Sequence, residues 1–496
     1  MIILEKIKDN KFLTIFLIII SFIGLSLASV SLLIENSYWW DELYSVTASS
    51  LPINDLFREF VFKDVHPPLH LIILHFWINA FGDSEIATRS LSFIFSISSF
   101  LIITIWSFKR LDFKNCIPII LFFISSWLFA KYAQETRAYS LMLFLSTIST
   151  LLMIEIIRSS TYSRGKVFLF VLSILLLSIT HYFGFMYGGL LLIFMLFYLK
   201  KINDKIVIFI TGLACFIWPT IHLLNGNIAS RAENFHVQSD GMHTTISLFV
   251  NSIFPHSYVL RKIVEEPWIE VSTAFITIIL FIIILNMFFR SIINTLYKDS
   301  IKISKLLVYI LTSFILTVAF IDLHTPVSTL KNFIVILPLV AILFGYMMYT
   351  LKDHIKTYNV LLVIFIMGLP IHSYLQISDK VYPLHNYKKS VQYILDNKLY
   401  ETRKIYYLGN KDNIRAKIHY DMAFFYFKNK TNYDLKIYPM ALDKIYNLDE
   451  PFVYFTQHVA VDPDLFIGTF KDRNIIINYY EPKQKVKYSS LVFYTE

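Results

Sequence analysis

Residues 12–34 read FLTIFLIIISFIGLSLASVSLLI, and residues 38–42, YWWDE, follow shortly after them. The apolar run carries no charge and, at about 1.5 Å per residue, is long enough to cross a bilayer. It is longer than the apolar core of a signal peptide, about 7–15 residues, so it predicts an uncleaved first span. Tryptophan is typical of the lipid–water interface. We therefore expect Asp41 and Glu42 at that boundary, where a lipid head group and a polar substrate can meet.

The composition excludes an ordinary soluble protein. Of 496 residues, 56% are hydrophobic and only 16% are charged, and the mean hydropathy is +0.56. A soluble domain of this size carries far more charge. The net charge of +9 is typical of basic cytoplasmic loops, so we expect no nucleic-acid partner. Both cysteines, Cys116 and Cys215, fall in apolar runs, and no disulfide framework is implied.

Eleven apolar runs predict the topology. They lie near 12–34, 85–108, 116–133, 138–157, 167–181, 183–199, 206–224, 271–290, 303–322, 332–350 and 358–376. With these spans, the basic clusters at 109–114, 158–166, 200–205, 290–305 and 352–356 all fall on the side of the N-terminus. The positive-inside rule makes that side cytoplasmic. The expected fold is a polytopic α-helical membrane protein with about 11 transmembrane helices.

One further apolar segment, Pro67 to Phe81, is short and is interrupted by histidines. We interpret it as a juxtamembrane or re-entrant helix on the outer face. The preceding residues 53–63 have apolar side chains at helical spacing and charges between them, which predicts an interfacial helix. Together they form an outer-face loop over 35–84, and a second outer loop covers 225–270.

The composition changes near residue 378. Charges become frequent, and short runs at 405–408, 435–438, 452–456, 475–480 and 490–494 are typical of strands, with a helix expected over 413–428. We predict a transmembrane domain over 1–377 and a small α/β domain over 378–496. The parity of the spans places this second domain outside the cytoplasm.

The first candidate site residues are an acidic pair and the residues at the turn His66-Pro67-Pro68. Asp41, beside Glu42, can act as a general base on an acceptor hydroxyl or amine; the alternative is a helix cap or a surface pair. The prolines after His66 fix the entry into the next helix and leave its first N–H groups open. Those groups, with His66 and Lys63, can bind a phosphate; the alternative is a rigid corner.

A second group of candidates lies at predicted span ends. Arg137 lies between two predicted spans with almost no loop, so its charge needs an anionic partner. That partner is either Glu135, a lipid head group or a substrate phosphate. Lys331 is at the start of a late predicted span and is a candidate phosphate ligand. The alternative is a lysine that only extends its ammonium group to the membrane surface. His181 marks a tight hairpin and, with Gln134 and Glu135, is a candidate for orienting an acceptor. No histidine and carboxylate spacing gives a convincing metal site, so no cofactor is expected, although a divalent metal is left open.

The order of these motifs resembles a known family. The first span, YWWDE at 38–42, HPPL at 66–69, FGDSE at 81–85 with Arg89, and QETRAYSL at 134–141 resemble family-39-type glycosyltransferases of the GT-C superfamily, relatives of protein O-mannosyltransferases and aminoarabinose transferases. The match is fairly specific over 12–145 and rests on layout elsewhere. It implies a polyprenyl-phosphate-sugar donor and an inverting transfer on the periplasmic or outer face of a bacterial inner membrane, with Asp41 as the base.

The resemblance also implies the phosphate ligands. Family members often have lysine where this chain has His66, so Lys63 and Arg137 would carry more of that task. Lys331 stands where many relatives have arginine, which keeps a cation but loses a bidentate grip. The acceptor would be a cell-envelope glycan, a lipid or a protein, and membrane lipids would surround the spans.

Three other functions are left open by the residues alone. A transporter for polyprenol or a lipid-linked sugar would explain many spans, but it predicts charges deep inside several of them. A non-catalytic membrane scaffold would leave the acidic and proline motifs unexplained. An oligosaccharyltransferase with a pyrophosphate-linked donor would normally need a metal ion.

Overall fold

The computed structural model describes residues 19, 21–26, 29, 37–64, 66–159, 161–225, 242–253, 298–325, 327–350, 387–408, 416–428, 436–440, 444, 448, 450–455, 475–479 and 491–495. The expected spans at 271–290 and 358–376 lie outside these residues, as do most of 12–34 and much of the outer loop at 225–270.

The chain divides into two compact units, each built from separate stretches of sequence. The first, the helical unit, comprises Met1–Ser29, Phe57–His70 and Ser90–Gln376. The second, the mixed unit, comprises Val30–Leu56, Leu71–Arg89 and Ile377–Glu496. The expected boundary at residue 377 stays a prediction, but the C-terminal residues do cluster with two segments from the outer-face loop and its flanks.

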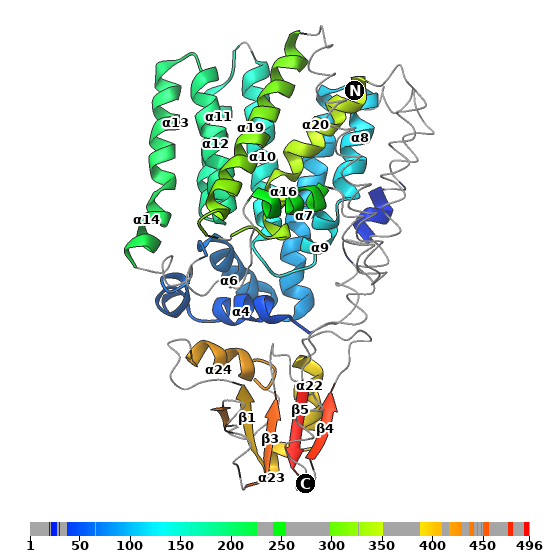
Figure 1. Ribbon diagram of the computed structural model, residues 1–496, viewed down its shortest axis with the longest axis vertical. Helices are drawn as coiled ribbons and strands as arrows, with labels where there is room; N and C mark the ends of the chain where they lie inside the picture. The colour runs from blue at the N-terminus through cyan, green and yellow to red at the C-terminus, as the bar shows by residue number, and fades with distance from the viewer. Residues whose placement is uncertain are drawn as a thin grey trace. The chain divides into compact units, whose positions relative to one another are not determined.

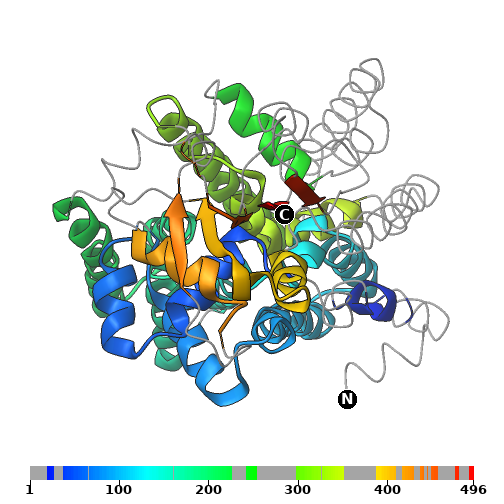
Figure 2. The same ribbon diagram turned by 90° about the horizontal axis from the view of Figure 1, so that it is seen from below.

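Apolar helices of very different lengths form the helical unit. Their order is α7 (Glu85–Arg110), α8 (Phe113–Ile124), α9 (Trp127–Tyr132), α10 (Tyr139–Arg158), α11 (Arg164–Ser178), α12 (Tyr182–Tyr198), α13 (Ile202–Cys215), α14 (Ile217–Leu224), α16 (Met242–Ile253), α19 (Lys298–Asp322), the 3₁₀ helix η2 (Leu330–Ile336) and α20 (Leu337–Thr350). Successive helices α10 to α13 pack as neighbours (Figure 1). Figure 2 looks along most of these helices and shows that they run roughly parallel to one another.

Five helical stretches are long and apolar enough to cross a membrane among the described residues. They are Glu85–Arg110, Tyr139–Arg158, Ile202–Leu224, Ile303–Asp322 and Leu330–Tyr349. Each coincides with an expected span, which confirms a polytopic α-helical membrane protein. The expected span at 116–133 is instead broken into α8 and α9. The Ser125 hydroxyl donates to the Leu121 carbonyl, and Ser126 caps α9 by accepting from the Phe129 N–H, because serine side chains compete for backbone groups.

Close backbone packing fixes two helix contacts in this unit. A Cβ added at Gly345 of α20 would lie 2.3 Å from a side-chain carbon of Ile119 in α8. A Cβ added at Gly184 of α12 would lie 2.6 Å from the carbonyl oxygen of Leu177 in α11. Glycine therefore lets both helix pairs approach more closely than any larger residue permits.

The mixed unit contains the short helices of the outer-face loop and one sheet. Its early helices are α4 (Trp40–Ser49), α5 (Ile53–Asp55) and most of α6 (Leu69–Phe81). The π-helix η1 (Leu56–Val61) continues α5 into the helical unit, so residues 53–61 are helical as expected. At 13 residues, α6 is about 20 Å long, which is too short to cross a hydrocarbon core of about 30 Å.

The C-terminal residues form a five-stranded sheet in the order β2-β1-β3-β5-β4 (Figure 1). Its strands are β1 (Lys404–Leu408), β2 (Ile437–Met440), β3 (Phe452–Phe455), β4 (Ile475–Tyr479) and β5 (Leu491–Thr495), each within two residues of its expected position. Strand β1 runs parallel to both neighbours, and β5 runs antiparallel to both. The helices are α22 (Tyr387–Asp396), α23 (Leu399–Thr402) and α24 (Ala416–Phe424). Val391, Ile394 and Ala423 pack with Ile405 and Val453 in its core.

Candidate functional site

A buried ion pair holds the acidic motif in the mixed unit. Arg89, at the start of α7, donates from Nε to Glu42 Oε1 at 2.9 Å and from Nη2 to Glu42 Oε2 at 2.8 Å. The side chains are 2% and 1% exposed, respectively. The same Nη2 donates to the Ser37 carbonyl at 3.2 Å, and the Trp39 N–H donates to Glu42 Oε2 at 3.3 Å. Glu42 therefore caps α4 and joins it to α7 with bidentate geometry.

Asp41 has a different environment from its neighbour. It is half-buried in the first turn of α4, where a carboxylate is favoured by the helix dipole. Its carbonyl accepts the Ser45 hydroxyl at 3.0 Å, which is an ordinary contact within the helix. The two carboxylate oxygens of Glu42 are thus both engaged by Arg89. The catalytic assignment of both residues stays a prediction.

Aromatic hydroxyls extend this network to the C-terminal residues. The Tyr426 hydroxyl accepts the Tyr38 N–H at 2.8 Å and donates to Glu85 Oε1 at 3.0 Å. Burial, then the negative charge of Glu85, raises the Tyr426 pKa well above its ordinary value, so this hydroxyl stays protonated. The Lys388 ammonium lies 3.6 Å from Glu85 Oε2. Tyr426, just after α24, thus binds the segment that carries Asp41, and Lys388 of α22 pairs with Glu85 at the start of α7.

A basic cluster surrounds His181 in the helical unit. His181 caps α12, and its Nδ1 accepts the Phe183 N–H at 3.2 Å. Burial, and then the charges of His66, Lys331 and Arg137, hold the His181 pKa well below its ordinary value. His181 is therefore neutral, and Arg137 and Lys331 supply the fixed positive charge of the cluster. The expected site residues His66, Arg137, His181 and Lys331 thus lie together.

Aromatic contacts order the same cluster. The His66 and His181 ring centroids are 6.1 Å apart, and the Tyr139 and His181 centroids are 5.8 Å apart. The Lys331 ammonium lies 5.4 Å from the Tyr139 ring centroid, within cation–π distance. Tyr139, which opens α10, therefore places Lys331 beside His181.

Backbone hydrogen bonds fix the approach to Lys331. Asp322, at the end of α19, is buried and accepts the Val327 and Ser328 N–H groups at 2.8 Å and 3.0 Å through Oδ1. Its Oδ2 accepts the Thr245 hydroxyl at 2.5 Å. A buried carboxylate with three donors is well compensated, so this turn sets where η2 and Lys331 begin.

The other expected phosphate ligands have carboxylate partners. Lys63 donates to Glu59 at 2.7 Å on the surface, where the Lys63 side chain is 51% exposed. Hydrogen bonds from Lys63 and then Arg58 lower the Glu59 pKa to about 2. His66 Nδ1 lies 3.1 Å from Asp64 Oδ2. The first N–H group of α6, expected to be open, donates from Leu69 to the Ile179 carbonyl at 3.0 Å, so the prolines leave less of an anion site than expected.

Gln134 and Glu135 are buried in the turn before α10. The Gln134 side-chain amide donates to the Ala130 carbonyl at 2.8 Å. The Glu135 carbonyl accepts both the Ser92 hydroxyl, at 2.6 Å, and the Arg137 N–H, at 2.7 Å. Glu135 Oε1 lies 3.9 Å from the Lys131 ammonium. These contacts shape the turn that carries Arg137, and an acceptor-orienting role for either residue stays a prediction.

The sequence did not single out several residues of these networks. In the sequence, Arg89 and Tyr139 stand out only as parts of longer motifs, and nothing distinguishes Asp64, Lys131 or Tyr426. An arginine near the start of an apolar helix normally needs a buried partner, which was an available signal for Arg89. Among the described residues, no group of three or more His, Cys, Asp or Glu side chains could hold a metal ion.

Comparisons with known proteins give a likeness in fold. No protein-family model matches the chain, and no curated protein matches it in sequence. The fold is similar to that of ArnT from Cupriavidus metallidurans in the apo state and bound to undecaprenyl phosphate. Each comparison has a TM-score of 0.56 and 10% sequence identity and covers 97% of this chain and 98% of that chain. At this identity the likeness concerns the fold alone, and it agrees with the GT-C type of fold expected from the sequence.

Proposed function

We propose that this protein is an inverting glycosyltransferase that moves a sugar from a polyprenyl-phosphate donor to an acceptor on the outer face of the membrane. The acceptor classes are a cell-envelope glycan, a lipid or a protein. The observation that carries the proposal is the gathering of Arg137 and Lys331 around the neutral His181, in a chain whose fold resembles a structure bound to undecaprenyl phosphate.

The basic cluster is suited to the donor phosphate. As the bond between the anomeric carbon and the phosphate oxygen breaks, negative charge grows on the phosphate. Preorganised cations aimed at such charge contribute strongly to catalysis. Arg137 and Lys331 supply them, while the neutral imidazole of His181 can donate a hydrogen bond from Nε2, because its Nδ1 already accepts the Phe183 N–H. Polyprenyl phosphate is the leaving group.

Asp41 is suited to the acceptor. Its carboxylate takes a proton from the acceptor hydroxyl or amine as that atom attacks the anomeric carbon from the face opposite the phosphate. One bond to the anomeric carbon forms and one breaks, so the configuration inverts. Glu42 is held by Arg89 and acts by orienting α4 and therefore Asp41.

The charges of the candidate spans argue against transport. In all five described candidate spans, every Asp, Glu, Lys and Arg lies within the first or last five residues. A transporter is expected to carry ionisable groups deep inside several spans. The gathering of ionisable residues at helix ends is better suited to chemistry at the membrane surface.

The direct test is a transfer assay in liposomes with a panel of polyprenyl-phosphate sugars and candidate acceptors. Wild type should release free polyprenyl phosphate, and Asp41→Asn should not. Asp55→Asn is the matched control, since it makes the same change in the same unit, and it should keep full activity. Release by Asp41→Asn at the wild-type rate would refute the base assignment. No release by wild type across the panel would refute the proposed function.

A further inference from the structure

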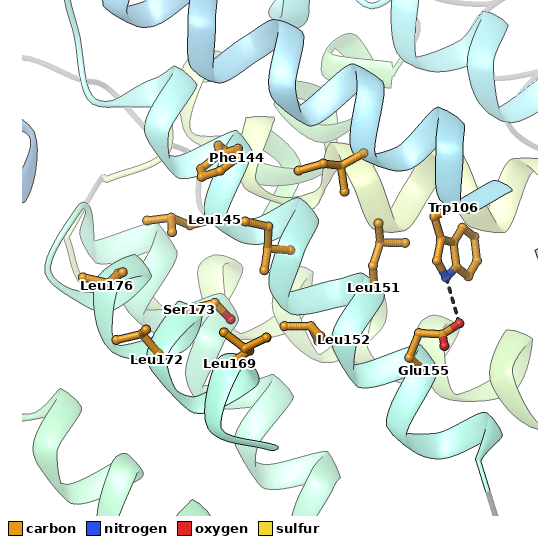
Figure 3. Close-up of a pocket in the computed structure, with 12 residues that line it drawn as sticks. Trp106, Phe144, Leu145, Leu151, Leu152, Glu155, Leu169, Leu172, Ser173 and Leu176 are labelled. Carbon is orange, nitrogen blue, oxygen red and sulfur yellow. Dashed lines mark hydrogen bonds between the residues drawn. The ribbon is translucent and has the colours of Figure 1, made fainter. Parts of the chain in front are cut away.

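An apolar groove runs along one side of the helical unit, away from the basic cluster around His181. Helices α7, α10 and α11 line a cavity of about 460 Å³ (Figure 3). Trp106 and Glu155 lie at one end of it, and Phe144 and Leu176 lie at the other. Between them the lining is almost entirely leucine and isoleucine, with Ser173 as its other polar residue.

The groove opens towards the side that lipid would occupy. Leu169 and Leu172, which line it from α11, are 50% and 38% exposed. From Phe144 to Glu155 along α10 the groove is about 16 Å long at 1.5 Å per residue. That is about half of a hydrocarbon core of about 30 Å. Its length therefore matches the depth of one leaflet.

Three cations meet at the end marked by Trp106. Arg110 ends α7 and lies 2.5 Å from Glu155 Oε2, and Lys166 of α11 lies 3.5 Å from the same oxygen. Arg158 ends α10, and its Nη2 donates to the Arg110 carbonyl at 3.4 Å. Glu155 also accepts the Trp106 indole N–H at 3.1 Å. Glu155 balances only one of the three positive charges, so the end of the groove has an excess of positive charge.

We propose that this groove binds an anionic phospholipid, with one acyl chain along α10 and the head-group phosphate at Arg158 and Lys166. The apolar lining and one-leaflet length suit the chain, and the excess positive charge suits the phosphate. These basic residues belong to the loops expected in the cytoplasm, so the lipid comes from the inner leaflet. The site is independent of the proposed transfer reaction, which is assigned to the outer face.

Trp106 provides a local probe, because bromine on an acyl chain quenches a neighbouring indole. The protein is reconstituted in phosphatidylcholine vesicles, and either brominated phosphatidylglycerol or brominated phosphatidylcholine is added. The difference in fluorescence quenching between wild type and Trp106→Phe gives the part of the quenching that comes from Trp106. Phosphatidylglycerol should half-quench this contribution at a mole fraction lower by a factor on the order of ten, since each basic residue near a lipid surface adds a several-fold preference.

Two charge-matched variants test the basic end. Arg158→Gln with Lys166→Gln should bring the two lipids to nearly equal quenching. Lys200→Gln with Lys205→Gln removes as many charges from the loop and helix that follow α12 and should keep the preference. Equal quenching of Trp106 by both lipids in wild type would overturn the proposal, and so would an unchanged preference in the Arg158 and Lys166 variant.

A variant-free measurement covers the case in which a substituted protein does not fold. Wild type is equilibrated in detergent with equal amounts of phosphatidylglycerol and phosphatidylcholine and is then analysed by native mass spectrometry. One phosphatidylglycerol should stay bound after most phosphatidylcholine has dissociated. Equal retention of the two lipids contradicts the proposed site.

Discussion

Neutralising Glu42 should destabilise the mixed unit strongly. The Arg89 side chain is only 2% exposed and stays charged in Glu42→Gln, but it loses the carboxylate that faces it. Two N–H groups of Arg89 donate to the two carboxylate oxygens, at 2.9 Å and 2.8 Å, but a glutamine amide has only one acceptor oxygen, and its NH2 group cannot accept from Arg89. One hydrogen bond to a charged partner, worth about 1.5–3 kcal/mol, is therefore lost. The uncompensated buried charge brings the expected loss to about 3–5 kcal/mol.

The assay is a urea titration in detergent micelles, followed by tryptophan fluorescence, because Trp39 and Trp40 adjoin the ion pair. Glu59→Gln is the matched control. It removes the same charge from a pair of similar length, 2.7 Å, whose lysine is half-exposed, and exposed pairs contribute little. Its unfolding midpoint should equal that of wild type, while Glu42→Gln should unfold at a clearly lower urea concentration.

A double variant separates the ion pair from other effects of the substitution. Replacing both partners by methionine removes the buried charge together with its counter-charge, and such replacements are often nearly neutral. Glu42→Met with Arg89→Met should therefore be more stable than Glu42→Gln. The reasoning fails if Glu42→Gln has the midpoint of wild type, or if the double variant is no more stable than Glu42→Gln.

Three further predictions concern the helical unit. Arg137→Gln should raise the KM for the donor about 10–100-fold in the transfer assay, since a charged phosphate contact contributes about 1.5–3 kcal/mol. Gly184→Ala should lower the thermal midpoint, because its Cβ would lie 2.6 Å from the Leu177 carbonyl oxygen and such overpacking costs about 1–3 kcal/mol. Burial, then the charge of Arg137, lowers the His70 pKa from 6.5 to about 3. The unfolded chain therefore binds the extra proton between these values, and stability falls as the pH drops below 6.5, by about 2 kcal/mol at pH 5. Thermal unfolding of His70→Phe should lack this part of the pH dependence.

The sequence predicts elements whose pattern is local. Strands β1 and β3 are rich in β-branched and aromatic residues, which are typical of strands. Both strands lie at the positions that this pattern predicts. The helix α22 was not predicted, since its ten residues, YKKSVQYILD, are few and half polar. A helix of that length is marginal alone, and the packing of Val391 and Ile394 in the sheet core decides it.

The basic cluster could be predicted only in part. Arg137 and Lys331 were identified singly, because cations at span ends stand out in an apolar sequence. Their approach to His181 depends on Tyr139 and on the turn organised by Asp322, residues far apart in the chain. Their assembly requires the tertiary fold, and no spacing along the sequence encodes it.

Neighbouring acids on one helix cannot share one partner, and this divides the roles of Asp41 and Glu42. Successive residues of an α-helix point about 100° apart, so adjacent side chains do not face the same group. Glu42 faces Arg89, which lies at the start of α7. The sequence does not predict this pairing, because the partner comes from another helix. Asp41, one residue earlier, is offset from Glu42 by about 100° around the axis of α4. The contact between Glu42 and Arg89 is therefore consistent with the proposed proton transfer to Asp41.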